Sequence, residues 1–320
     1  MAFSKKNSPV NPFLKWAGGK SQILGELESR FPKELAGSRS IDDYFGSAGR
    51  RISKYVEPFI GGGAVYFLVN SKYRPDECYI SDVNEELILC YRVVKESPDS
   101  LADILREYEG EYLKLDEEKR QEFYYNIRSS YNQKKEGFSY SSVNSSAVER
   151  AASLIFLNRT CFNGLYRVNG SGGFNVPFGR YKNPHIAIED SIYSASEILE
   201  NTEIHCRDFE EAGRLADDET FFYFDPPYRP INKTSQFNNY AKDGFSDDDQ
   251  RRLAEFFRFC DSKSAKVMLS NSDPKNTNPD DDFFDSLYED FNIKRVPAKR
   301  RINSKGSGRG EINEIVVTNY

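Results

Sequence analysis

Two patterns of hydrophobic and polar positions alternate along the chain. Short apolar or aromatic runs that end at Gly, Pro, Asp or Asn predict buried strands, and longer stretches with helical periodicity predict helices. The predicted strands lie within 53–69, 78–82, 203–209, 221–224, 265–271, 291–296 and 312–319, and further helices are expected near 247–260 and 282–288. Strands that alternate with helices predict an α/β fold with a doubly wound, mostly parallel sheet, in which the last two strands are antiparallel.

Residues 98–200 interrupt this alternation with a mainly helical pattern. The helices are expected at 101–112, 117–134 and 147–157, followed by a segment at 158–184 that is dense in Gly, Asn and aromatic residues. Within that segment, alternation at 165–168 and 173–178 around an Asn-Gly-Ser-Gly turn predicts a β-hairpin. We therefore expect one sheet domain, formed by residues 1–97 and 201–320, that is interrupted by an inserted helical domain at 98–200.

The stretch FFYFDPPY, at 221–228, combines a buried strand with an abrupt end. Its aromatic run is followed by Asp225, by Pro226 and Pro227, which stop the strand and stiffen the backbone, and by Tyr228. A carboxylate and an aromatic ring are thereby placed at the carboxyl edge of the sheet, where open α/β sheets bind ligands. A strand that simply ends in a Pro-Pro turn is the alternative interpretation.

A glycine-rich turn and an acidic residue indicate a nucleoside cofactor. Gly61 lies in a turn after a predicted strand, and Asp82 ends the next strand 21 positions later. This spacing is close to that at which an acidic residue meets a ribose hydroxyl in nucleotide-binding βαβ units. The earlier sequence GGKS is not a nucleoside-triphosphate loop, because Leu14 stands where that motif requires glycine.

Charge is distributed unevenly along a chain whose net charge is −6. Residues 119–185 contain ten Lys or Arg and three Asp or Glu, and residues 294–310 contain seven Lys or Arg and no acid. A basic face on an acidic body is compatible with a polyanionic partner, although each segment alone could be a solvated loop.

The inventory of Cys and His narrows the chemistry further. Five scattered cysteines without CxxC spacing indicate free thiols in a reducing compartment, and two histidines make a histidine-based general base or metal cluster improbable. No apolar span is long enough to cross a membrane. We expect a cytoplasmic protein that uses no metal.

Four segments in order resemble one family. FLKWAGGK, VEPFIGGGA, the block from NRTCFNGLYRVN to GGFNVPFGRYKNP, and DPPY are similar to the motifs of Dam-type DNA adenine-N6 methyltransferases, most of all the DpnII-type methylases of GATC. The resemblance implies a Rossmann-like fold of the S-adenosyl-methionine-dependent methyltransferase type, with S-adenosyl-methionine as cofactor and double-stranded DNA as partner. It also implies that the insertion at 98–200 recognises DNA and that residues 1–97 and 201–320 carry cofactor binding and DPPY.

The resemblance also implies roles for individual residues. The cofactor-binding set comprises Trp16, Lys20, Phe59, Gly61, Gly63, Asp82, Asp208, Phe209 and Asp225. The DNA-binding set comprises Lys15, Arg159, Phe162, Asn163 and Arg167. An arginine can read guanine N7 and O6 in the major groove, and a phenylalanine can wedge into a gap left by a flipped base. Ordinary turn and packing roles are the alternative for each hairpin residue.

The catalytic set comprises Asp225, Pro226, Pro227 and Tyr228. Asp225 and the Pro226 carbonyl would accept hydrogen bonds from the adenine amine, and Tyr228 would stack on the flipped ring. Alternatives are an adenine methylase of another site such as GATATC, a methylase of another planar nitrogen, and a catalytically silent DNA-binding relative. A restriction endonuclease with the same site is a candidate partner, and residues 36–54 have no assigned function.

Overall fold

The computed structural model describes residues 10–35, 51–229, 245–299 and 311–320. Seven strands form one sheet in the order β3-β2-β1-β4-β5-β7-β6. The strands are β1 (Lys54–Glu57), β2 (Glu77–Asp82), β3 (Thr202–Cys206), β4 (Thr220–Phe224), β5 (Lys266–Ser272), β6 (Asn292–Lys299) and β7 (Glu311–Thr318). Most of the 36–54 stretch and of the 294–310 basic segment lies outside the described residues.

Strand direction confirms the predicted α/β sheet. β1 pairs in parallel with β2 and β4, and the β2–β3 and β4–β5 pairs are parallel as well. β7 pairs antiparallel with both β5 and β6, so the predicted antiparallel ending is confirmed. Strand order reverses between β1 and β4, and the carboxyl ends of these two strands form the switch point at which such sheets bind ligands.

Strand β4 is the buried centre of the sheet. All five of its residues are buried, and alternate side chains enter two separate hydrophobic clusters. Phe221 and Tyr223 pack on one face of the sheet, and Phe222 and Phe224 pack on the other. A parallel strand that is covered on both faces has no polar alternation, which explains the continuous aromatic run.

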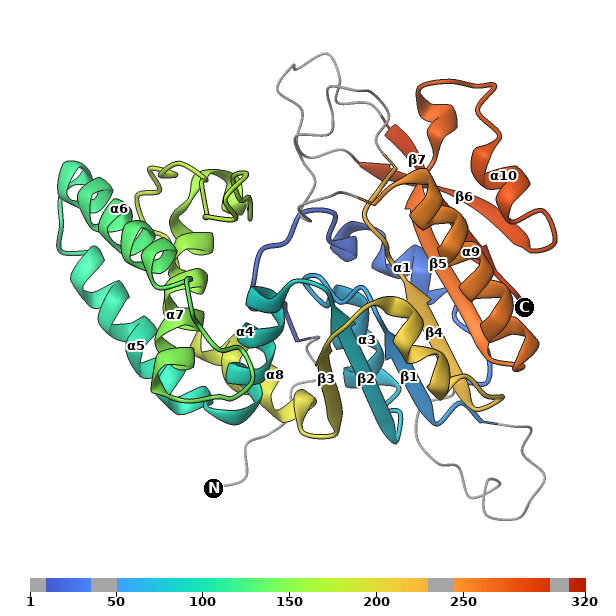
Figure 1. Ribbon diagram of the computed structural model, residues 1–320, viewed down its shortest axis with the longest axis horizontal. Coiled ribbons are helices and arrows are strands. Elements are labelled where there is room, and N and C mark those ends of the chain that lie inside the picture. The colour runs from blue at the N-terminus through green and yellow to red at the C-terminus, as the bar shows by residue number, and fades with distance from the viewer. Residues whose placement is uncertain (1–9, 36–50, 230–244, 300–310) are drawn as a thin grey trace.

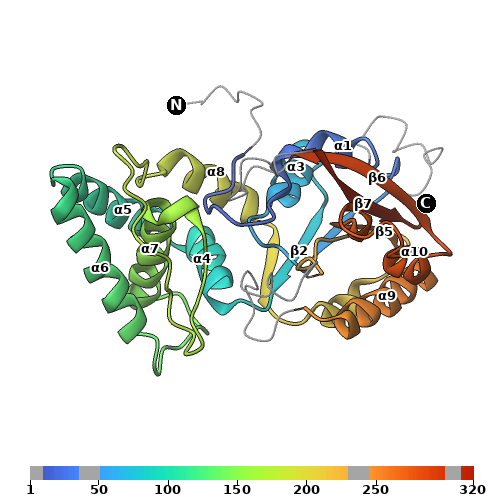
Figure 2. The same ribbon diagram turned by 90° about the horizontal axis from the view of Figure 1, so that it is seen from above.

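Helices cover both faces of the sheet (Figure 2). One face carries α1 (Leu24–Glu28), α3 (Ala64–Lys72) and α4 (Glu85–Glu96), and the other carries α9 (Asp247–Ser262) and α10 (Phe283–Leu287). Ser246 closes a capping box at the start of α9, and its hydroxyl accepts the Asp249 backbone N–H at 3.2 Å. This cap fixes the first turn of α9 beside the end of β4.

The remaining helices form a lobe beside the sheet (Figure 1). They are α5 (Pro98–Tyr112), α6 (Glu117–Gln133), α7 (Ser145–Thr160) and α8 (Glu189–Leu199). Aromatic rings of α5, α6 and α7 meet edge to face, as Tyr112, Phe123 and Phe156 do at 5.5 to 6.2 Å. The lobe shares one continuous hydrophobic core with the adjacent face of the sheet. The three helices predicted in this region are confirmed.

The predicted hairpin is only partly formed. The turn is present, with the Asn169 N–H donating to the Gly173 carbonyl at 2.9 Å, but the two expected strands reduce to an isolated Val168–Phe174 bridge. The prediction of two strands is therefore wrong. The ladder stops after the Asn175 N–H bond to the Arg167 carbonyl at 3.0 Å, because the next donor on that arm would be Pro177, which has no N–H. On the outer edge, where a third strand would pair, Asn132 of α6 bonds both the N–H and the carbonyl of Phe174, at 2.8 and 3.0 Å.

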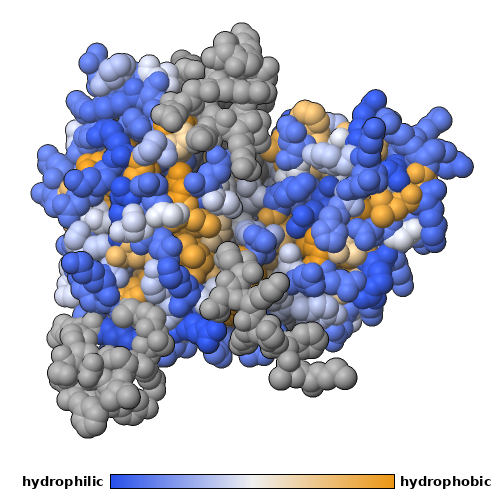
Figure 3. Space-filling model, turned by 180° about the vertical axis from the view of Figure 1, so that it is seen from behind, coloured by the Kyte–Doolittle hydropathy of each residue, from blue (hydrophilic) through white to orange (hydrophobic). Residues whose placement is uncertain are grey.

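The surface carries no membrane-crossing element within the described ranges, because none of their helices is long and apolar enough. Hydrophilic side chains cover most of the face in Figure 3, and hydrophobic ones gather there in small patches. All five cysteines are free thiols, as predicted.

Candidate active site

Two loops meet at the switch point of the sheet. The glycine-rich loop follows β1, and the Asp225–Tyr228 turn follows the neighbouring strand β4. The Gly61 N–H donates to Asp82 Oδ2 at 3.2 Å, which joins the loop to the end of β2. The structure thus brings Gly61, Gly63, Asp82 and Asp225 to one edge of the sheet.

Backbone geometry explains the glycines of this loop. Gly63 has a φ of 72° where it precedes α3, and a Cβ atom there would lie 2.5 Å from the Tyr91 hydroxyl. Gly61 has a φ of 44°, and its added Cβ would lie 3.0 Å from the Trp16 ring. Both positions favour glycine, because left-handed φ strains other residues and the space is occupied.

Asp82 is held in place by main-chain donors. Its Oδ1 accepts the Asn84 N–H at 3.0 Å, in addition to the Gly61 contact. Burial raises the pKa of Asp82 to about 6, although these backbone N–H groups oppose the shift. A carboxylate in this position is ionised near neutral pH and can accept hydrogen bonds from hydroxyl groups of a ligand.

A buried ion pair links the N-terminal segment to the turn after β4. Lys20 Nζ lies 2.5 Å from Asp225 Oδ1 and 3.1 Å from the Gly18 carbonyl, and its side chain is 3% exposed. Burial is the largest influence and would lower the pKa of Lys20, but the charge and hydrogen bond of Asp225, together with Tyr223 and Glu314, raise the pKa overall. The hydroxyl of Ser270, at the end of β5, donates to Asp225 Oδ1 at 3.3 Å.

Carboxyl groups outnumber cations around this ion pair. Glu314 of β7 has Oε2 4.0 Å from Lys20 Nζ, and Glu57 at the end of β1 lies close enough for Asp225 and Lys20 to change its pKa. Burial raises the pKa of Glu57, of Glu314 and of Asp225. A buried site with three carboxyls and one ammonium favours a further positive charge, either a proton or a cationic ligand.

Tyr228 presents its ring beside the ion pair, with Lys20 Nζ 4.7 Å from the ring centroid. Burial raises the pKa of its hydroxyl, and the charges of Asp225 and Glu314 add to the shift. The preceding Pro227 carbonyl accepts a hydrogen bond from Gln250 Nε2 of α9 at 3.2 Å. The turn is therefore anchored to α9 as well as to β4.

Asp208 and Phe209 follow β3 and lie at the opposite side of the glycine loop. Asp208 caps a short 3₁₀ helix (Phe209–Leu215) and accepts a 2.8 Å bond from Arg252. The Phe209 ring packs 5.3 Å from Phe59. Phe209 is almost fully buried, and its ring belongs to the hydrophobic cluster that also contains Phe224 and Phe256.

Four of the five candidate DNA-binding residues are exposed. Three of them lie at 162–167, and the fourth, Lys15, lies in the N-terminal segment that packs beside it. Phe162 is 52% exposed, and Lys15, Asn163 and Arg167 are exposed as well. Arg167 Nε donates to Asn175 Oδ1 at 2.7 Å, across the hairpin turn. A large exposed apolar ring among polar residues is typical of a surface that meets a partner.

Arg159 differs from the other four because its guanidinium is turned inward. Its Nη2 donates to the Phe13 carbonyl at 2.9 Å, and burial lowers its pKa. Another arginine of the basic segment, Arg150, is buried in an ion pair with Glu86 at 2.5 Å. The basic surface is therefore smaller than the residue count of this segment indicates; its exposed members are Lys119, Lys134, Arg167, Arg180 and Lys182.

The N-terminal segment connects the glycine-rich loop to the lobe. Asn158 of α7 bonds both the N–H and the carbonyl of Lys15, each at 2.9 Å, and also the Gly164 carbonyl at 3.0 Å. Trp16 stacks on Tyr166 with centroids 5.1 Å apart. A Cβ atom at Gly164 would lie 2.4 Å from Lys15 Cδ, so this glycine permits the close approach.

Several polar residues that the structure places around Asp225 were not identified from the sequence. Ser270 and Asn271 are polar residues at the end of an apolar strand, a signal that could have indicated them. Glu314 is less visible, because it lies at the start of its strand. β7 runs opposite to its neighbours, so its beginning meets the carboxyl ends of the others, and Glu314 pairs with Ser272.

Comparison with known proteins decides the family. Residues 16–302 match the family of D12 class N6 adenine-specific DNA methyltransferases. The chain belongs to that family. Its likeness extends over nearly the whole length of several curated members.

The Type II methyltransferase M.MjaIII of Methanocaldococcus jannaschii is 50% identical over 312 residues, which are 97% of this chain and 99% of that protein. The Type II methyltransferase M1.LlaDCHI of Lactococcus lactis subsp. cremoris is 41% identical over 99% of this chain and 98% of its own. The DNA adenine methylase of Escherichia coli K12 is 31% identical over 98% and 95%. The resemblance inferred from the four motifs is confirmed, and this adenine-specific DNA methyltransferase is an enzyme of α/β fold.

Proposed function

We propose that this adenine-specific DNA methyltransferase transfers a methyl group from S-adenosyl-methionine to the N6 of an adenine flipped out of duplex DNA, within GATC. The observation that carries the proposal is the position of Asp225, at the end of β4 beside the glycine loop of β1 and in contact with Lys20. We propose further that the lobe at 98–200 is the DNA-recognition domain, and that residues 1–97 and 201–320 form the catalytic domain.

The charges of the site support a cationic cofactor. S-adenosyl-methionine carries a positive sulfonium, and the carboxyls of Asp225, Glu57 and Glu314 exceed the single ammonium of Lys20. Lys20 would bind the carboxylate of the methionine part, and Asp82 would accept bonds from the ribose hydroxyls. Trp16, Phe59 and the two glycines would line the rest, with Asp208 and Phe209 around the adenine ring.

The turn after β4 suits methylation of an exocyclic amine. The N6 lone pair is delocalised into the ring, and two acceptors for its N–H groups favour a pyramidal nitrogen with the lone pair free to attack. Asp225 and the Pro226 carbonyl would be these acceptors. Tyr228 would stack on the flipped base, and stacking of about 1–3 kcal/mol offsets much of the cost of extruding it.

The proton balance needs no strong base. The nitrogen attacks the methyl carbon as the carbon–sulfur bond breaks, and the alkylated nitrogen then releases an acidic proton. Asp225 can accept this proton because burial raises its pKa. In-line positioning of the two reactants can supply about 7–11 kcal/mol of the barrier.

The exposed hairpin residues support recognition of duplex DNA. Arg167 and Lys15 would contact bases and phosphates, and Phe162 would occupy the gap left by the flipped adenine. Arg159 would act indirectly, by holding the backbone that leads to Lys15 through its bond to the Phe13 carbonyl. A restriction endonuclease of the same site is the proposed functional partner.

A substitution of Asp225 tests the mechanism. Asp225→Ala should keep the fold. Its rate of methyl transfer from tritiated S-adenosyl-methionine to duplex DNA should fall about 100-fold or more, because the substitution removes the charged acceptor. Asp290→Ala is the control, since Asp290 is an exposed acid just before the start of β6, which pairs with the end of β7 at the opposite edge of the sheet. Near-normal turnover in Asp225→Ala would overturn the assigned role.

A further inference from the structure

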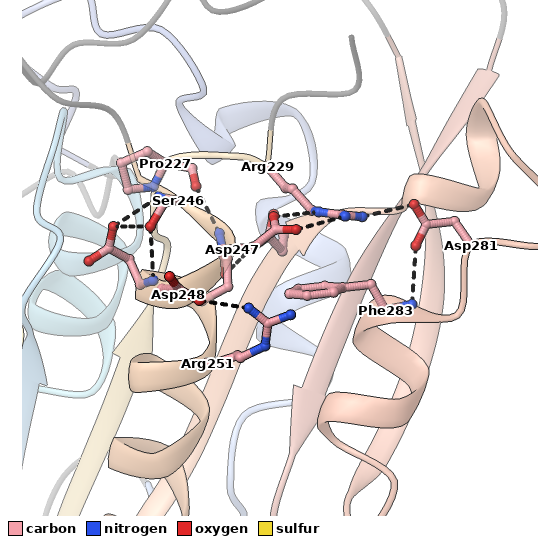
Figure 4. Close-up of polar contacts among 11 residues, drawn as sticks. Pro227, Arg229, Ser246, Asp247, Asp248, Arg251, Asp281 and Phe283 are labelled. Atoms are coloured by element: carbon pink, nitrogen blue, oxygen red, sulfur yellow. Dashed lines mark hydrogen bonds and ion pairs between the residues drawn. The ribbon is translucent and has the colours of Figure 1, made fainter. Parts of the chain in front are cut away.

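The residue that follows the DPPY turn is held from three sides (Figure 4). Arg229 forms a two-point contact with Asp247 of α9, with Nε–Oδ1 at 2.7 Å and Nη2–Oδ2 at 2.9 Å. Its Nη1 lies 2.8 Å from Asp281 Oδ2, and the guanidinium stands 4.2 Å from the centroid of the Phe283 ring. Each of its three nitrogen atoms thus has a partner, and one face of the group is covered.

These contacts engage three of the five N–H donors of the guanidinium, at least one on each nitrogen, with carboxylates of the protein itself. The bidentate fork is the geometry in which arginine fixes a carboxylate most rigidly. Arg229 therefore serves the interior of the protein, although it follows a segment that contacts substrate in the proposed function. Its three partners come from the first turn of α9 and from the start of α10.

The same helix turn holds the other side of Tyr228. Gln250, fully buried in α9, donates to the Pro227 carbonyl at 3.2 Å and accepts a bond from Asn271 Nδ2 at 3.2 Å. Positions 227 and 229 are thus both anchored to the beginning of α9. Tyr228 lies between the two anchors, so a shift of either one would move its ring.

We propose that Arg229 is a positioning residue that holds the Tyr228 ring and the Asp225–Pro226 acceptors in their reactive geometry, acting through Asp247 and Asp281. This inference rests on the proposed function. It predicts an effect on the rate of the chemical step rather than on binding, because the guanidinium is bound to the Asp247 and Asp281 carboxylates of the protein.

The test compares Arg229→Ala and Arg229→Lys with Arg251→Ala. Arg251 is a matched control, because it stands in the same turn of α9, pairs with Asp248 at 2.8 Å and approaches the Arg229 cluster only through the Phe283 ring, whose centroid is 5.5 Å from its guanidinium. In Arg229→Ala, kcat per folded molecule should fall roughly 10- to 100-fold, since a displacement of about 1 Å can cost about 100-fold in rate. The KM for duplex DNA and the Kd for S-adenosyl-methionine should stay close to wild type.

Arg229→Lys should recover part of the rate, because an ammonium keeps the charge but cannot form the fork. Asp247→Asn combined with Arg229→Ala should lose little more than Arg229→Ala alone, as expected for two residues that act as one unit. Hydrogen–deuterium exchange should show faster exchange of the Tyr228 and Arg229 amides in Arg229→Ala than in Arg251→Ala.

Three results would contradict the inference. They are an unchanged kcat in Arg229→Ala, a raised KM for DNA at unchanged kcat, which would indicate a DNA contact, and amide exchange identical to that of Arg251→Ala. Wild-type activity is measured first on the same duplex. A silent wild type would refute the proposed function, whereas the exchange experiment would still decide whether Arg229 holds the turn.

Discussion

At the scale of single residues, the site depends on a few buried charges. Lys20 and Asp225 are 205 positions apart and form its central ion pair, with Glu314 and Glu57 nearby. A lone buried charge would be costly, and removal of one partner from such a pair leaves the other uncompensated. A bound cofactor would replace some of these contacts, because its carboxylate and sulfonium supply opposite charges.

The raised pKa of Asp82 predicts a pH dependence of cofactor binding. The carboxylate must be ionised to accept ribose hydroxyls, so affinity for S-adenosyl-methionine should fall as pH drops through about 6, by roughly tenfold per pH unit well below that value. Isothermal titration calorimetry at pH values from about 1.5 units above the pKa of Asp82 to about 1 unit below it measures this dependence. Asp82→Asn cannot titrate and should bind with a flat pH profile.

Ionisation of Asp82 has the opposite effect on folding stability from its effect on cofactor affinity. A carboxyl whose pKa is higher in the folded than in the unfolded chain favours folding while it is protonated. Ionisation of Asp82 should therefore lower the free energy of unfolding as pH rises from 3.8, the ordinary pKa of an aspartate, to its folded-state pKa of about 6. The binding experiment has its own contradicting result. If the affinity of the wild type for S-adenosyl-methionine varied with pH as little as that of Asp82→Asn, the Asp82 carboxylate would not contact the ribose.

At the scale of elements, α6 replaces a missing strand in support of the hairpin. Tyr124 and Arg128 both donate to the Val176 carbonyl, at 2.8 and 3.1 Å, and Lys135 donates to the Gly172 carbonyl at 2.8 Å. Tyr124, Arg128 and Asn132 form a stripe on one face of α6, since residues four apart share a face of a helix, and Lys135 follows just after its end. The hairpin is therefore positioned by side chains of α6 and of the turn that follows it.

Asn132→Ala tests this support. Loss of its two bonds to Phe174 should lower the free energy of unfolding by about 1–3 kcal/mol. It should also reduce the ratio of methylation rates on GATC over single-mismatch sites, because Arg167 and Asn175 lie on the loosened arms. Rates on matched and mismatched duplexes measure the ratio, and Gln133→Ala, an exposed neighbour on α6, is the control. An unaltered ratio in Asn132→Ala would show that recognition does not depend on this support.

Local sequence patterns predicted where helices and strands lie, but they did not predict the contacts between them. The strand at 221–224 and the helices of the lobe were visible because burial periodicity is written into consecutive residues. The fork of Arg229 with Asp247 and Asp281 was not visible, because it joins segments 18 and 52 positions apart. The side chains that support the hairpin were not visible for the same reason, since they lie 37 to 52 positions from the backbone they bond.

At the scale of the whole molecule, the segment at 13–20 joins three parts of the enzyme. It contacts the glycine loop through Trp16, the lobe through the Lys15 backbone, and the DPPY turn through Lys20. The site residues thus come from both ends of the chain, and the fold at the switch point gathers them. From the sequence, only the family motifs taken together indicated that these distant segments meet at one site.

The central claim is that this DNA methyltransferase modifies the adenine of GATC. Long-read sequencing of DNA from a methylation-free bacterial host that expresses the chain tests it most directly. We predict N6-methyladenine at GATC in cells with the wild type and at no site in cells with Asp225→Ala. Methylation confined to GATATC or to another sequence would contradict the assigned site. Absence of methyladenine with the folded wild type would contradict the proposed activity.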